Sequence, residues 1–173
     1  MSKHTIEPRE KVQVFTDGSC RDGSGGIAYS LCREDGTQSC YSRKYIDTTP
    51  VRMELLAVLT ALTHLDTDGT ADITVLTDCM HIVSTANSGT LNYCRMHGFD
   101  GSGSLEPNSD LWLRLAIEME KHKKVKFQWI KGHANNPVNN RCHFLANRKR
   151  KDETSKALRD FRLSLADIAT LYG

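Results

Sequence analysis

The chain has 173 residues, 39% hydrophobic and 25% charged, with a formal net charge of +2, which suits a single domain with one core. No segment approaches a membrane span of roughly 20 apolar residues, and the polar start MSKHTIEPREK lacks the apolar stretch of a signal peptide. Six irregularly spaced cysteines without a C-x-x-C pair indicate neither a zinc ribbon nor a disulfide framework, so we expect a reduced, cytoplasmic protein.

Strands are predicted in the first half of the chain from alternating apolar residues. The alternation covers residues 12–17, 25–35 and 37–46, with the turn signal EDG between the last two. Residues 71–78, ADITVLTD, form a further apolar run rich in β-branched residues. A helix lies between this run and the earlier strands, so its pairing is expected to be parallel. The predicted order is βββαβ.

Helices are predicted from apolar residues at helical spacing. The segment TTPVRMELLAVLTALTHL reads as a helix with Thr49 as N-cap and Pro50 at its first helical position, ending near Asp66 to Gly69. Further elements are expected as a helix after Asp78 to about Ala86, a short helix at Leu91–His97, a helix capped by Ser109 or Asp110, a strand at 125–130 and a helix near Pro137.

The end of the chain follows a charged link, RKRKDETSK. Four apolar residues then recur at helical spacing, namely Leu158, Phe161, Leu165 and Ile168. This spacing predicts an extra amphipathic helix that packs against its own domain. The alternative is a helix that contacts a protein partner or a second copy of the chain.

Three acids are expected to meet. Asp17 and Asp78 each end a strand as V-x-T-D, and the ends of adjacent strands bring side chains together. Glu54 lies too deep in its helix to be the acidic partner of an N-cap, and the small residues Ala57 and Ala61 on its row let the helix approach the sheet. Taken alone, Asp17 before glycine is also common turn chemistry. Together the acids repel one another unless their pKa values rise or divalent cations bind, and oxygen ligands favour Mg²⁺ or Mn²⁺ over zinc.

The positive charge is concentrated in one part of the chain. Residues 110–151 hold eleven Lys and Arg against three Asp and Glu. Such a basic region suits a polyanionic partner. The alternative is a solvated helix face without a partner.

Five motifs follow one another in the chain: FTDGSC, TTPVRMELLA, LTDCMHIV, SDLWLRL and WIKGHANNPVNNRCHFLA. With these motifs in this order, the chain closely resembles the type I ribonuclease H family, bacterial branch. The resemblance implies an α/β RNase H-like fold over residues 11–151, with a mixed five-stranded sheet flanked by helices. It leaves an N-terminal tail, 1–10, and a C-terminal helical extension, 152–173. The implied activity is hydrolysis of the RNA strand of RNA/DNA hybrids with two Mg²⁺ ions. Separately, we expect the chain to be a monomer.

The resemblance also implies roles for individual residues. Asp17 would bridge both metal ions, Glu54 and Asp78 would complete the metal site, and His133 would assist the attacking water or product release. His133 otherwise reads as a surface loop histidine. His143 stands where the family pattern has an aspartate, the fourth metal ligand, so we expect it to bind metal or orient a water and to shift the preference toward Mn²⁺. Nucleic-acid contacts are implied for Cys20, Thr49, Asn139 and Lys131.

Other departures concern recognition of the hybrid. Pro50 and Val51 stand where family members usually have two asparagines, and Met80 stands where they have a glutamine. Contacts to 2′-hydroxyls distinguish RNA from DNA, so we expect weaker hybrid affinity. One alternative is a weakly active or inactive nucleic-acid-binding module with this fold, and another is a metal nuclease acting on DNA junctions or ends. The three acids favour activity, and KGHAN and RMEL favour the ribonuclease.

Overall fold

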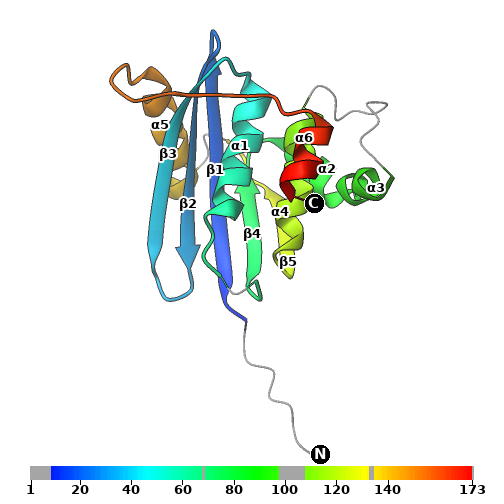
Figure 1. The fold of residues 1–173 in the computed structure, drawn as a ribbon. Helices are drawn as coiled ribbons and strands as arrows, with labels where there is room; N and C mark the ends of the chain where they lie inside the picture. Colours follow the sequence, from blue (N-terminus) through cyan, green and yellow to red (C-terminus); the bar gives the residue numbers. More distant parts are fainter. Residues whose placement is uncertain (1–8, 68, 98–107, 133–134, 173) are drawn as a thin grey trace, which may run out of the picture.

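A mixed six-stranded sheet forms the centre of the protein, in the order β5-β4-β1-β2-β3-β6 (Figure 1). The computed structural model describes residues 9–67, 69–97, 108–132 and 135–172. The strands are β1 (Lys11–Arg21), β2 (Ser24–Arg33), β3 (Gln38–Ile46), β4 (Asp72–Thr77), β5 (Lys124–Trp129) and β6 (Leu158–Arg159). β1, β2 and β3 form an antiparallel meander, whereas β4 pairs in parallel with both β1 and β5. The predicted βββαβ start and five-stranded core are therefore confirmed, with β6 as a short addition.

Helices cover both faces of the sheet. They are α1 (Pro50–Thr63), α2 (Met80–Asn87), α3 (Thr90–His97), α4 (Ser109–Glu120), α5 (Pro137–Lys151) and α6 (Leu165–Tyr172). α1 packs on β1 and β2, α4 packs on α1, and α5 packs on β1, β2 and β3 from the other face (Figure 1). Successive residues of β1 show this division, because Val14 belongs to the core beneath α1 and Phe15 to the smaller core beneath α5.

The first strand is longer than predicted. The alternation suggested that it ends at Asp17, but β1 continues to Arg21, which pairs with Ser24 of β2. Asp17 therefore lies inside a long hairpin, opposite Ala28, and not at the end of a strand. Because β1 carries Asp17 on the same face as Phe15, the carboxylate faces the side of the sheet that α5 covers.

The helix caps agree with the sequence in one case and differ in another. Thr49 is the N-cap of α1 and Pro50 is its first residue, as predicted, although α1 ends at Thr63 and not near Gly69. The N-cap of α4 is Asn108, so the assignment of that cap to Ser109 or Asp110 was wrong. The carboxylate of Asp110 is instead used in a buried ion pair with Arg52.

The C-terminal segment contains a strand as well as a helix. The expected helical run through Leu158 and Phe161 is wrong, because Leu158 pairs with Tyr45 at the edge of the sheet and Phe161 is 68% exposed. Only α6 is helical, and it packs on α4 with Ile168 fully buried. In Figure 1 the segment between α5 and α6 crosses the sheet as a strap and returns the chain to α4.

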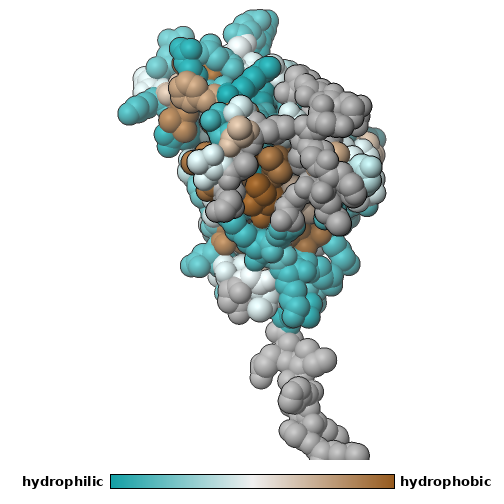
Figure 2. Space-filling view, turned by 45° about the vertical axis from the view of Figure 1, so that its right-hand side comes forward, coloured by the Kyte–Doolittle hydropathy of each residue, from teal (hydrophilic) through white to brown (hydrophobic). Residues whose placement is uncertain are grey.

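Among the described helices, none is both long and apolar enough to span a bilayer. Figure 2 shows one side of the molecule, on which the coloured surface is largely hydrophilic and hydrophobic residues gather in a patch near the centre of the view.

Candidate active site

Three acidic side chains from separate elements converge on one place. Asp17 lies within β1, Asp78 directly follows β4, and Glu54 lies in the second turn of α1. Because β1 and β4 are parallel neighbours, Asp17 and Asp78 lie side by side where β4 ends. One ligand atom from each acid lies within 4.8 Å of the other two. The structure thus brings together the three acids that the sequence singled out.

A close approach between α1 and β1 makes this convergence possible. A Cβ atom at Gly18 would lie 2.5 Å from the backbone nitrogen of Glu54, so only glycine leaves room for the helix. Ala57 and Ala61, on the same row of α1 as Glu54, are fully buried against the sheet, as expected from their size. The Asp-Gly pair at 17 and 18 therefore serves helix packing and is not a turn.

The acids are electrostatically unfavourable as they stand. Burial raises the pKa of Asp17 to about 6; the negative charge of Asp78 adds to this effect, and His143 opposes it. Burial, followed by the charges of Asp17 and Asp78, raises the pKa of Glu54 well above its usual value. Glu54 Oε2 is buried and has no hydrogen-bond partner among the described residues. A hard divalent cation would offset the repulsion among the acids and would bind the unpartnered oxygen of Glu54. Because all the donors are oxygens, the site fits Mg²⁺ or Mn²⁺.

His143 lies against the acidic cluster through Asp17. Its Nδ1 is 2.9 Å from Asp17 Oδ2, and its Nε2 is 3.0 Å from Asn147 Nδ2. Asn147 Oδ1 accepts hydrogen bonds from Ser19 Oγ at 3.0 Å and Arg150 Nη2 at 3.5 Å, so the amide nitrogen faces the imidazole. On this network, a neutral His143 donates from Nδ1 to Asp17 and accepts at Nε2. His143 is therefore positioned to orient Asp17, and it must exchange one of these bonds to bind a metal ion.

Asn147 and Trp129 support the site and were not singled out from the sequence. Asn147 lies four residues after His143, on the same face of α5, which is the spacing at which helix side chains meet. Trp129 Nε1 donates to the backbone carbonyl of Asp78 at 3.0 Å, which fixes the chain where it leaves β4. A spacing rule could have found Asn147, whereas the Trp129 contact depends on strand register.

The remaining predicted site residues lie in different environments. His133 lies outside the described residues. Lys131 is exposed, and Cys20 and Thr49 are half-buried at the hairpin and at the start of α1. Asn139 is only 2% exposed, so its side chain is not presented at the surface of α5.

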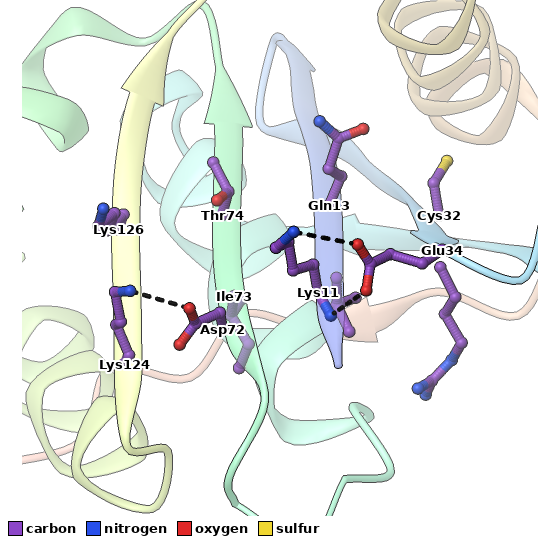
Figure 3. Close-up of a pocket in the computed structure, with 11 residues that line it drawn as sticks. Lys11, Gln13, Cys32, Glu34, Asp72, Ile73, Thr74, Lys124 and Lys126 are labelled. Atoms are coloured by element: carbon purple, nitrogen blue, oxygen red, sulfur yellow. Dashed lines mark hydrogen bonds and ion pairs between the residues drawn. The ribbon is translucent and has the colours of Figure 1, made fainter. Parts of the chain in front are cut away.

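A separate hollow of about 480 Å³ lies against the sheet, toward the starting ends of β1 and β4 (Figure 3). Lys11 and Lys124 point into it, but each is paired with an acid: Lys11 Nζ lies 3.2 Å from Glu34, and Lys124 Nζ lies 2.9 Å from Asp72. Because the acids here are neutralised, this hollow has none of the uncompensated negative charge found at Asp17.

Three converging carboxylates on an α/β sheet, beside a strongly basic segment, are the arrangement expected of a metal-dependent nuclease. A sequence model of the family described as RNase H matches residues 9–151. The Ribonuclease H of Pectobacterium atrosepticum is 36% identical over 139 residues, which cover 80% of this chain and 88% of that protein. The Ribonuclease HI of Haemophilus influenzae is 33% identical over 147 residues, covering 84% and 93%. The chain therefore belongs to the type I ribonuclease H family.

Solved structures show the same fold. LC9-RNase H1, described as a type 1 RNase H with the type 2 active-site motif, is similar with a TM-score of 0.67 and 22% identity, over 96% of this chain and 87% of that one. The RNase H1 of Halobacterium salinarum NRC-1 gives a TM-score of 0.64 at 16% identity, over 80% and 96%. At these identities the similarity concerns the fold alone.

Proposed function

We propose that this chain is an endoribonuclease that hydrolyses the RNA strand of RNA/DNA hybrids. The observation that carries the proposal is the meeting of Asp17, Glu54 and Asp78 within 4.8 Å in a member of the ribonuclease H family. When bound, divalent ions supply the positive charge that lowers the pKa of a water and offsets the charge developing on the phosphate and the leaving oxygen. The side chains of the protein supply the geometry.

In this proposal each residue has a defined task. Asp17, Glu54 and Asp78 hold the metal ions, and their raised pKa values and the unpaired Glu54 Oε2 support this assignment. His143 fixes the carboxylate of Asp17 through its Nδ1–H, or becomes a ligand itself. Lys131 and the basic residues around it hold the phosphate backbone, and His133 assists the water or product release. The catalytic domain spans residues 11–151.

We further propose that the enzyme uses two divalent ions. Mg²⁺ can fill both positions, but the site prefers Mn²⁺ over Mg²⁺. The reason is the imidazole of His143, which suits Mn²⁺ better than Mg²⁺. The His143→Asp variant supplies a carboxylate at this position, so its ratio of Mg²⁺ to Mn²⁺ affinity should rise several-fold in calorimetric titrations. The ratio of cleavage rates should move in the same direction. An unchanged affinity ratio would show that His143 is not a metal ligand.

We also propose that the enzyme acts in the cytoplasm as a monomer. In this proposal the C-terminal segment, 152–173, packs against its own domain and stabilises it. Its helix α6 packs on α4 and buries Ile168, which supports packing within the chain over a role in binding a protein partner. Size-exclusion chromatography with light scattering tests the oligomeric state directly.

Cleavage assays test the proposed activity. Labelled RNA/DNA hybrid, duplex RNA, duplex DNA and single strands are incubated with Mg²⁺ or Mn²⁺, beside Asp78→Asn and the control Asp66→Asn, an exposed acid away from the cluster. We expect cleavage of the RNA strand of the hybrid alone, lost in Asp78→Asn and kept in Asp66→Asn. Binding of the hybrid without cleavage in either metal would instead indicate a binding module, and cutting of duplex DNA a different nuclease.

A further inference from the structure

The last turn of α5 contains four basic residues that differ in what they contact. Lys149 Nζ donates to Ser155 Oγ at 2.6 Å and lies 3.4 Å from Asp152, and Arg150 Nε donates to Ser19 Oγ at 2.9 Å. Within the described part of the chain, the side chains of Arg148 and Lys151 have no hydrogen bond or ion pair. Two of the four cations thus bond to other parts of the fold, and the other two have no polar partner among the described residues.

Arg148 and Lys151 line a hollow together with an exposed aromatic ring. The hollow measures about 590 Å³, and its lining residues are Phe144, Asn147, Arg148, Lys151, Asp152 and Thr154. Positions 144, 148 and 151 lie on one face of α5, because residues three and four apart are neighbours on a helix. The side chain of Phe144 is 60% exposed. Single exposed aromatics are ordinary, but this one shares a hollow with two unpaired cations.

This hollow, here called the α5 groove, adjoins the active site. Asn147 lines the groove, and the same side chain lies 3.0 Å from His143 Nε2, whose other ring nitrogen lies 2.9 Å from Asp17. Two hydrogen bonds therefore connect the groove to a proposed metal ligand. Asn147 lies about one helical turn beyond His143, so the groove continues from the acidic cluster toward the C-terminal end of α5.

We propose that the α5 groove binds an unpaired nucleotide on a strand that extends beyond the hybrid held at the active site. The proposal rests on the proposed ribonuclease function and adds a subsite to it. Phe144 offers a face on which a base stacks, and Arg148 and Lys151 neutralise the adjacent phosphates, the combination by which proteins bind single strands. A base inside a duplex is already stacked and cannot reach the ring, so the groove selects unpaired nucleotides.

One acid in the groove does not oppose this assignment. Asp152 accepts hydrogen bonds from Ser155, from the hydroxyl and backbone of Thr154 and from Lys149, and these contacts lower its pKa. Its charge is therefore compensated locally by Lys149, which leaves the positive charges of Arg148 and Lys151 in excess.

Binding of hybrids with and without overhangs tests the proposal. Anisotropy titrations in EDTA, where no metal-dependent cleavage occurs, compare a blunt hybrid with hybrids carrying an eight-nucleotide 5′ or 3′ extension on the RNA or on the DNA strand. The four extensions present the same chemistry, and the comparison identifies the strand and polarity. The proteins are wild type, Phe144→Ala, the double variant Arg148→Ala/Lys151→Ala, and the matched control Phe161→Ala/Arg162→Ala on the exposed C-terminal segment.

We expect one extension to improve the affinity of wild type by about tenfold over the blunt hybrid, in line with the stacking of one base on an aromatic ring. This ratio should fall close to one in Phe144→Ala and in the double variant, and should persist in the control. No advantage for any extension in wild type would overturn the proposal, as would an advantage that survives in Phe144→Ala. If wild type fails to cleave a blunt hybrid with Mg²⁺ or Mn²⁺, the proposed function fails, whereas the overhang ratio still reports on the groove.

Discussion

Two charged side chains, one fully buried and one half-buried, stand two residues apart on α1, and their surroundings differ completely. Arg52 is fully buried and donates to both oxygens of Asp110, at 2.8 and 2.9 Å, and to both oxygens of Asp160, at 2.6 and 2.8 Å. Glu54 faces two further acids, and its Oε2 has no partner among the described residues. The Arg52 charge faces two carboxylates and makes four hydrogen bonds to them, whereas the Glu54 charge is surrounded by like charge.

The difference separates stability from function. The Arg52 cluster joins α1 to Asp110 of α4 and to Asp160 of the C-terminal segment, and Thr48 Oγ1 adds a bond to Asp160 at 2.7 Å. The Glu54 cluster joins β1, α1 and β4 at a cost in folding energy that a bound metal ion offsets. Removing a charge should therefore have opposite effects on the free energy of unfolding in the two clusters.

The largest expected effect is at Arg52. The Arg52→Ala variant leaves Asp110 and Asp160 buried without their cation, and breaking a buried pair in this way costs about 3–5 kcal/mol. Urea unfolding followed by circular dichroism measures the loss. The matched control is Arg159→Ala, because Arg159 forms a surface pair with Asp47 at 2.9 Å with both side chains more than half exposed. Such pairs contribute about 0–1 kcal/mol. Equal losses in the two variants would show that the buried Arg52 cluster stabilises the fold no more than a surface pair does.

A smaller loss is expected at Asp160, which lies beyond the family match that ends at residue 151. Asp160→Asn keeps the shape of the side chain but removes the charge facing Arg52, and hydrogen bonds to charged groups contribute about 1.5–3 kcal/mol. We expect a loss of about 2 kcal/mol in urea unfolding. Asp167→Asn, on the exposed first turn of α6, is the control and should change little, because asparagine also accepts from Ser164. A C-terminal segment that contributes nothing to the fold would show no difference between the two.

The sequence predicted the functional cluster better than the structural one. Asp17, Glu54 and Asp78 could be found because each stands at a defined place in a strand or helix pattern, and the βββαβ order then brings them to one edge. The error at Asp17 was one of length, because alternation shows that a strand exists but not how far a hairpin extends beyond the sheet. The resemblance of the motifs to the family added a proposed role for each acid.

The Arg52 cluster could not be predicted in this way. Its partners lie 58 and 108 residues away in the chain, and no local pattern specifies such a pairing. Asp110 at the start of a helix has the composition of a cap, so local chemistry gave it the wrong role. The C-terminal segment failed similarly: the spacing of its apolar residues fits a helix, but pairing of Leu158 with the edge strand β3 overrides that preference.

The stability of the metal-free protein should depend on pH through the acidic cluster. The pKa of Asp17 is about 6 when folded, above its ordinary 3.8, because burial and Asp78 raise it against the opposing effect of His143. The folded state then binds more protons than the unfolded state between about pH 4 and 6, so stability must fall as pH rises through this window. From the size of the shift, Asp17 alone accounts for a fall on the order of 2 kcal/mol.

Comparison with Asp17→Asn isolates this contribution, because other acids titrate in both proteins. In EDTA, the variant should gain stability relative to wild type as pH rises from 4 to 7, and the gain should level off above the pKa of Asp17. A difference that does not vary with pH would show that Asp17 titrates normally. Excess Mn²⁺ should remove most of the pH-dependent loss in wild type above pH 6, because metal ions replace the protons.

The smallest effect expected is a gain in stability at Glu54, opposite in sign to the loss at Arg52. In EDTA at pH 7.5, Glu54→Gln removes a group that must either remain charged beside Asp17 and Asp78 or take up a proton, so we expect a gain of about 1 kcal/mol in urea unfolding. Glu153→Gln, at an exposed position, is the control and should leave stability unchanged. Added Mn²⁺ should stabilise wild type more than Glu54→Gln, since only binding to the folded state shifts the equilibrium. If Glu54→Gln is less stable than wild type without metal, then the favourable contacts of the Glu54 carboxylate, such as its hydrogen bond from the backbone of Gly18, outweigh the repulsion, and its cluster is of the same kind as that of Arg52.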